Sequence, residues 1–238
     1  VMFKKQEDTN YEISIKTLGN EQLNNKDAES PSTCLYSTLV PATSIPEGEE
    51  IASYIASHME PSETEIAFEL EGGKTYYLNG VIDFGLNTVT FRGNKTHPAK
   101  VIVGKEGGIM TQAGLKLKFI NFDCTEMTTE IGLIGLGKDP NKSLSTEALG
   151  YKAAGANQDG FVINNPVIIQ ECMIKNLKNS LLYGNKKPWT LRDFRITDCI
   201  VQMNNAGSNG VINLYGATGT IKDMTIKNST FYNLVKNS

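Results

Sequence analysis

The chain has 238 residues, of which 39% are hydrophobic and 21% are charged, with a formal net charge of −3. This composition supports a sizeable core and is not that of a disordered chain. No apolar run is long enough to span a membrane, and the basic residues follow no nucleic-acid-binding motif, so we expect neither a membrane-spanning segment nor a nucleic-acid partner.

Charge is divided unevenly along the chain. Residues 1–71 carry 4 Lys and Arg against 14 Asp and Glu, a net of −10, while residues 72–238 carry 19 against 12, a net of +7. A basic segment of this length predicts an anionic partner. The alternative is that the two parts of the chain simply complement each other.

The first predicted element is a strand within residues 1–18, where polar and apolar residues alternate over Asn10-Tyr11-Glu12-Ile13-Ser14-Ile15-Lys16. One strand is too short to form a domain. We therefore interpret residues 1–30 as a short strand left from an upstream β-sandwich, with a polar linker that begins at Gly19. Residues 31–238 then form the main domain.

A capping helix is predicted over Ile51–Met59, with Ile51, Tyr54, Ile55 and His58 on one face. Strands are expected after it at Glu65–Leu70, Lys74–Leu78, Thr88–Arg92, Lys100–Val103, Gly108–Thr111 and Leu115–Phe122. The long polar segment Gly137–Gly160 interrupts this rhythm. Such excursions often carry function, although an unselected surface loop has the same appearance.

An internal repeat decides the architecture. Residues 190–201 and 220–231 follow one template, thirty residues apart, and a looser third copy runs over Val167–Ile174. The copies align Ile169 with Ile196 and Ile226, and Cys172 with Cys199 and Ser229. A β-branched unit of this period stacks on copies of itself, so the sequence predicts an all-β, parallel β-helix, or solenoid.

The alternation of apolar residues breaks at Glu171, Asp198 and Asn228, which predicts a bend between two strands at these positions. The repeat pattern enters another turn as the sequence reaches Ser238. We therefore expect the β-helix to be incomplete at this end, with its last apolar rows exposed unless further chain or a partner covers them.

The four cysteines are Cys34, Cys124, Cys172 and Cys199. Two of them share a repeat position with Ser229, which indicates a small residue rather than a disulfide. None has a spacing typical of zinc ligands. We expect buried free thiols.

Two segments carry a family resemblance. Ile45-Pro46-Glu47-Gly48 leading to Phe68-Glu69-Leu70-Glu71-Gly72-Gly73-Lys74-Thr75-Tyr76 resembles the entry to pectate-lyase-like right-handed β-helices. Ile226-Lys227-Asn228-Ser229-Thr230-Phe231-Tyr232-Asn233-Leu234 resembles β-helix modules of uncharacterised function that follow a fibronectin-III-like domain in bacterial polysaccharide-utilisation surface lipoproteins. The resemblance implies a secreted protein, or one on the extracellular face of the outer membrane of a Gram-negative bacterium, acting with other outer-membrane glycan-uptake proteins.

Glycan recognition combines aromatic rings with cations, because sugars stack on flat faces while cations hold carboxylates. The loop before the second copy of the repeat has both kinds of side chain. Trp189 has an alternative interpretation as a lid over the core. The candidates for binding an acidic polysaccharide are Tyr183, Lys186, Lys187, Trp189, Arg192, Arg195, Tyr215 and Lys222.

The alternative function is a polysaccharide lyase that acts on uronate-containing glycans by β-elimination. Lyases of this fold take the proton with Arg or Lys while calcium or another cation neutralises the carboxylate. Asp193 and Asp223 share a repeat position and are candidate calcium ligands, although a solvated corner has the same pattern. A cofactor is otherwise not expected. A structural spacer in a surface complex is the third hypothesis.

Overall fold

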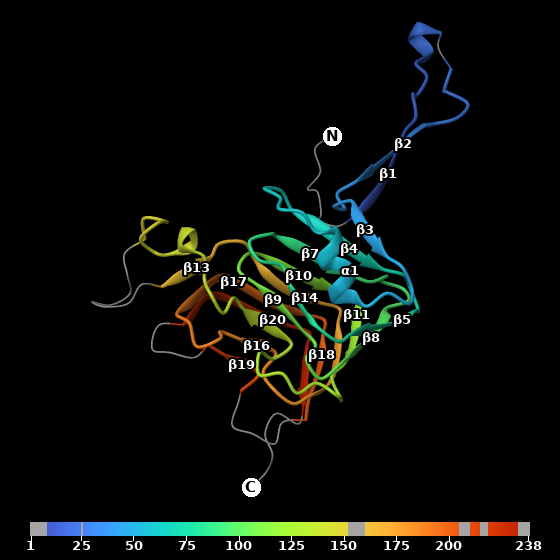
Figure 1. The fold of residues 1–238 in the computed structure, drawn as a ribbon. Helices are drawn as coiled ribbons and strands as arrows, with labels where there is room; N and C mark the ends of the chain where they lie inside the picture. The colour runs from blue at the N-terminus through green and yellow to red at the C-terminus, as the bar shows by residue number, and fades with distance from the viewer. Residues whose placement is uncertain (1–8, 25, 152–159, 205–209, 215–218, 233–238) are drawn as a thin grey trace. The chain divides into compact units, whose positions relative to one another are not determined.

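The computed structural model describes residues 9–24, 26–151, 160–204, 210–214 and 219–232 (Figure 1). The chain divides into two compact units, Val1–Pro41 and Ala42–Ser238. The boundary lies later than the sequence boundary at residue 31, because Ser32–Ser37 forms a strand of the first unit.

The first unit contains an antiparallel pair of strands, β1 (Asn10–Ile15) and β2 (Ser32–Ser37), with a 3-10 helix, η1 (Glu21–Leu23), between them in sequence. The alternating strand predicted near the N-terminus is thus present. The register places Tyr11 opposite Tyr36, with ring centroids 6.2 Å apart. Its descent from an upstream sandwich stays a prediction.

The second unit is a β-solenoid of about 6 turns, in which every described pair of neighbouring strands runs parallel. The prediction of a parallel β-helix is confirmed. Each complete turn contributes one strand to each of three sheets, which we name the first, second and third sheet in the order the chain meets them. The first sheet contains β3 (Ala42–Ile45), β4 (Ile66–Leu70), β7 (Val89–Arg92), β10 (Leu115–Lys118), β14 (Val167–Gln170), β17 (Trp189–Thr197) and β20 (Thr220–Lys227), with β13 (Phe161–Ile163) beside the start of β17.

The other two sheets have shorter strands. The second sheet contains β5 (Thr75–Leu78), β8 (Ala99–Val103), β11 (Ile120–Asp123), β15 (Met173–Leu177), β18 (Ile200–Met203) and β21 (Thr230–Tyr232). The third sheet contains β6 (Val81–Asp83), β9 (Gly108–Thr111), β12 (Ile134–Leu136), β16 (Leu182–Tyr183) and β19 (Ile212–Asn213). A second 3-10 helix, η2 (Lys142–Leu144), lies in the segment between β12 and β13.

The helix α1 (Ile51–His58) lies against β5 and β6 of the first complete turn, as expected of a cap. Its carboxylate N-cap, Glu50, accepts a hydrogen bond from Ser53 N at 2.8 Å. Ile51, Ala52 and Ile55 are buried. No helix among the described residues is long and apolar enough to cross a membrane.

Side chains of equal position stack into rows inside the solenoid. One row of the first sheet passes in register through buried side chains in five successive strands and ends at a sixth, in β20; its members are Phe68, Phe91, Leu117, Ile169, Ile196 and Ile226. The predicted alignment of the last three is confirmed. Ile226 is 48% exposed, and Met224 on the same strand is 55% exposed, because no described strand stacks beyond β20.

The bends between the first and second sheets use the left-handed backbone region. Glu171, Asp198 and Asn228 have φ angles of 48°, 57° and 49°, so the bend predicted at these positions is confirmed. Phe119, with φ 59°, occupies the same position one turn earlier. It divides the single strand expected over Leu115–Phe122 into β10 and β11, because a left-handed residue turns the chain out of the sheet.

Three of the four cysteines behave as expected. Cys124, Cys172 and Cys199 are buried and free, whereas Cys34 is exposed, so the expectation was wrong for Cys34. This residue lies in β2, whose described side chains are all exposed. Burial raises the pKa of Cys172 to about 12 and also raises the pKa values of Cys124 and Cys199.

The core row makes a testable prediction. Ile196→Ala should lower the free energy of unfolding by about 2–5 kcal/mol, since it removes a fully buried side chain from the middle of the row. Ile226→Ala is the matched control and should cost less than about 1.5 kcal/mol, since half of that side chain is already in water. Urea unfolding measures both. Equal losses would contradict the row described above.

Thiol reactivity makes a second prediction. A thiol reagent near neutral pH should modify Cys34 rapidly in the native protein, because the thiolate is the reactive form and Cys34 is exposed. The other three thiols should react only in denaturant, since their raised pKa values keep them protonated. Mass spectrometry of modified peptides counts the labels, and rapid labelling of Cys172 in the native protein would be inconsistent with its burial.

Candidate functional site

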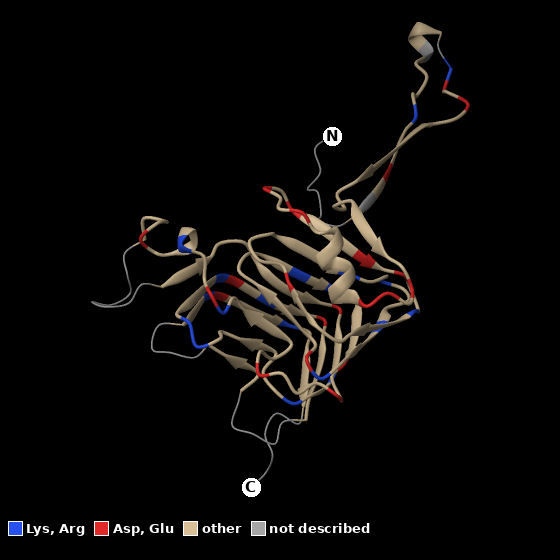
Figure 2. Ribbon diagram, viewed as in Figure 1, with Lys and Arg blue, Asp and Glu red and all other residues tan. Residues whose placement is uncertain are grey.

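Cations outnumber carboxylates on the outer face of the first sheet, and Figure 2 shows both signs of charge along its strands. On the earlier strands the charges form hydrogen-bonded ion pairs. Arg92 Nε donates to Glu69 Oε2 at 2.6 Å, and Lys116 Nζ donates to Glu65 Oε2 at 2.9 Å. Arg92 is largely buried, so this part of the face offers little charge to solvent.

The last two strands of this sheet carry charges that are open to solvent. Arg192 and Arg195 on β17 and Lys222 on β20 are all exposed. We name this group, together with Asp193, Asp223 and Tyr151, the basic surface. The structure thus brings three of the predicted glycan-binding residues onto one face, because β17 and β20 pair in parallel over almost their whole length.

The aromatic member of the basic surface comes from the long polar segment before β13. Arg192 Nη1 donates to the Tyr151 hydroxyl at 3.1 Å, and the guanidinium carbon lies 5.9 Å from the centre of the Tyr151 ring. The Tyr151 hydroxyl donates to Asn164 Oδ1 at 3.2 Å, and the residue is 42% exposed. Sequence reasoning singled out this segment but not Tyr151, because nothing local to the residue indicates its contact with a strand forty residues later.

The two aspartates of the basic surface lie in register, as their shared repeat position predicts. Asp193 accepts hydrogen bonds from Arg195 through both oxygens, one of them from Nε at 2.9 Å. Calcium takes about six to eight oxygen ligands. Over the described part of the chain, no group of three or more His, Cys, Asp or Glu is placed to hold a metal ion. Asp193 is therefore engaged by Arg195, and the role of Asp193 and Asp223 as calcium ligands stays a prediction.

The remaining predicted residues lie elsewhere. Tyr183 points outward from the third sheet and is partly buried, in register with Gly135. Lys186 is exposed and Lys187 half-buried in the turn between β16 and β17. Tyr215 lies outside the described residues.

Trp189 is a core residue and not a sugar platform. It is fully buried, its Nε1 donates to Gly137 O at 3.0 Å, and its ring centre lies 5.6 Å from that of Phe161. The cause is strand parity, because Trp189 and Leu191 on β17 both point into the solenoid. The alternative interpretation of this residue, a lid over the core, fits the structure.

The outer face of the second sheet has a groove that sequence reasoning missed. A hollow of about 550 Å³ runs beside the bends that join the first and second sheets, and a smaller one of about 220 Å³ lies next to it. Asn121 and Met173 line both. We name the two hollows together the second-sheet groove; its other lining residues are Lys95, Pro98, Lys100, Phe122, Asp123, Glu171, Cys172, Lys175, Asp198 and Ile200.

Charges in the groove are arranged in opposite-sign pairs. Lys95 Nζ lies 3.0 Å from Glu171 Oε1, and Lys100 Nζ lies 3.4 Å from Asp123 Oδ2. The Thr125 hydroxyl donates to Asp123 Oδ1 at 2.6 Å, and this bond is the main reason that the pKa of Asp123 is lowered, against the opposing effect of burial. Asp123 is therefore ionised at neutral pH.

Comparison with family models matches the whole described solenoid to uncharacterised domains. A model described as a domain of unknown function (DUF4957) matches residues 74–234, and another domain of unknown function (DUF4992) matches residues 1–75. The second match extends from the first unit into the first turn of the solenoid. No curated protein and no solved structure matches significantly.

Trp189 is the single tryptophan of the chain, so its fluorescence reports one position. We expect emission at short wavelength and weak quenching by acrylamide in the native protein, because the ring is buried. Saturating polygalacturonate should leave the emission maximum unchanged. A red-shifted, readily quenched signal in folded protein would contradict the placement of Trp189 in the core.

Proposed function

We propose that this chain, which belongs to the DUF4957 family of domains of unknown function, binds an acidic polysaccharide without cleaving it, through the basic surface of its solenoid. The observation that carries the proposal is the contact between exposed Arg192 and the exposed ring of Tyr151. It brings together a cation, which can hold a carboxylate, and an aromatic ring, on which a sugar can stack.

The chemistry of the cations supports this choice. A guanidinium presents five donors in a planar fork that matches a carboxylate, and Tyr151 engages one nitrogen of Arg192. Arg195 is paired with Asp193, so the charge that this surface offers to a carboxylate comes mainly from Arg192 and Lys222. Lys222 adds an exposed cation on the neighbouring strand.

The arrangement of strands supports a polymer rather than a single sugar. β17 and β20 are paired strands and lie about 4.8 Å apart. Charges on the two strands therefore recur along the solenoid axis at a spacing that is shorter than the length of a sugar chain. Basic residues exceed acidic ones by 7 over residues 72–238. This excess favours the approach of an extended polyanion.

The biological setting is part of the proposal and comes from the family resemblance. The pectate-lyase-like entry and the module-like repeat support a role in bacterial polysaccharide utilisation. The protein would then act outside the cell or on the outer-membrane surface, beside other proteins that take up the glycan.

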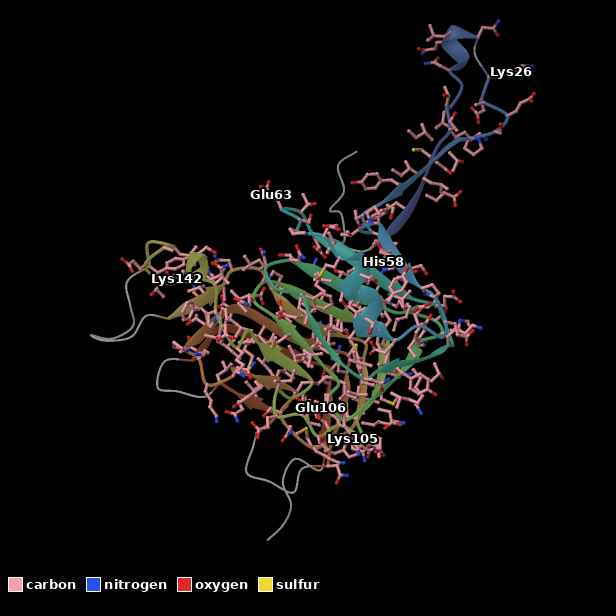
Figure 3. All side chains as sticks on the ribbon, viewed as in Figure 1. Lys26, His58, Glu63, Lys105, Glu106 and Lys142 are labelled. Carbon is pink, nitrogen blue, oxygen red and sulfur yellow. The ribbon has the colours of Figure 1, made fainter. Side chains whose placement is uncertain are left out.

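Gel retardation tests the proposal. The protein should migrate more slowly in gels cast with polygalacturonate or alginate than in plain gels, and added salt should weaken the effect because surface charges are screened. Arg192→Ala combined with Lys222→Ala should raise the apparent Kd about tenfold, equivalent to about 1.4 kcal/mol. Lys105→Ala is the control. This exposed lysine follows β8, and it lies well apart from Lys142 of the polar segment in Figure 3.

Three outcomes would reject the proposal. Absorbance from unsaturated product during incubation with these polymers would establish a lyase. Equal weakening by Lys105→Ala would indicate diffuse charge attraction without a site. No retardation by either polymer would leave a structural spacer.

A further inference from the structure

The second-sheet groove has no excess of positive charge. Its cations are Lys95, Lys100 and Lys175, and its carboxylates are Asp123, Glu171 and Asp198. Two of the three cations are already paired with carboxylates inside the groove. A polyanion gains little at such a site, so the groove and the basic surface differ in the ligand that suits them.

Apolar and polar side chains line the groove together. Met173 and Ile200 lie in register on neighbouring strands, and Ile200 is 41% exposed. Pro98 and Asn121 complete this surface. The larger hollow, of about 550 Å³, is open to solvent, so it suits a ligand that lies along the surface and uses both kinds of side chain.

Polar groups of the groove are held in fixed positions. Asn228 Nδ2 donates to Asp198 Oδ1 at 3.1 Å, which orients that carboxylate from the next turn. Asp123 is held by the Thr125 hydroxyl, and its lowered pKa keeps it an acceptor. Ionised carboxylates accept several hydrogen bonds but donate none, so these groups suit a ligand that is rich in hydroxyl donors.

Two exposed tyrosines continue the surface beyond the hollows. Tyr77 on β5 and Tyr232 on β21 are 51% and 39% exposed. Five strand steps separate them, which corresponds to about 24 Å. The pairing runs in register from Tyr77 through Ile102 and Asp123 to Lys175, shifts register between Ile174 and Leu177, and pairs Gln202 with Tyr232.

We infer that the second-sheet groove is a separate binding site for an uncharged oligosaccharide that lies along the stacked strands. Hydroxyl groups of the sugars donate to Asp123 and Asp198, and the C–H faces of the rings pack on Met173 and Ile200. Binding of a neutral chain here and of an acidic chain at the basic surface involves different sheets, so neither depends on the other.

Calorimetric titration with neutral hexaoses tests the inference. The probes are cellohexaose, xylohexaose, mannohexaose, laminarihexaose and maltohexaose, and at least one of them should bind. Ile200→Arg should weaken this binding at least tenfold, because a long charged side chain fills the groove. Ile226→Arg is the matched control, since it makes the same change at a similarly exposed isoleucine on the first sheet and should leave the Kd unchanged.

A second variant separates this site from the basic surface. The double variant Arg192→Ala, Lys222→Ala should bind the neutral hexaose as tightly as the wild type while it loses retardation by acidic polymers. Failure of all five hexaoses to bind would overturn the inference, and so would equal weakening by Ile226→Arg. Loss of neutral binding in the double variant would assign the neutral sugar to the basic surface instead. Circular dichroism establishes that each variant is folded.

Discussion

The structure depends on one constraint, which is that parallel strands of successive turns pair in register. Once β4, β7, β10, β14, β17 and β20 are stacked, each inward residue packs on its counterpart in the next turn and each outward residue lies beside its counterpart at the surface. Each added turn therefore buries apolar area against the turn before it, and contacts between elements far apart in the sequence are not needed. The same pairing leaves the last row exposed at Ile226 and Met224.

The bends between the first and second sheets are the second requirement for this regularity. Left-handed residues at Phe119, Glu171, Asp198 and Asn228 change the direction of the chain within one residue. Two of these bend residues, Glu171 and Asp198, also carry carboxylates that border the second-sheet groove. A structural position in the repeat is thus reused as the edge of a candidate site.

The three sheets give the solenoid distinct surfaces. Trp189 faces inward while Arg192 and Arg195 on the same strand face solvent. The first sheet combines cations with Tyr151, and the second combines paired charges with Met173 and Ile200. The two faces differ because outward side chains, unlike inward ones, are not required to repeat from turn to turn.

The sequence alone determined the parallel solenoid, its capping helix, the alignment of Ile169, Ile196 and Ile226, and the bend positions. The helix depends on the spacing of apolar residues over Ile51–Met59, and the other features depend on the spacing of residues within the repeat; both kinds of information are local. It did not determine the contact of Tyr151 with Arg192, the burial of Trp189 or the second-sheet groove. These depend on which strands pair, and on which alternate side chains of a strand point into the solenoid. The contact of Tyr151 also depends on the path that the long segment before β13 takes over the solenoid surface. Only the tertiary structure decides such features, because they join residues from different turns or from the irregular segment, where no period constrains the chain.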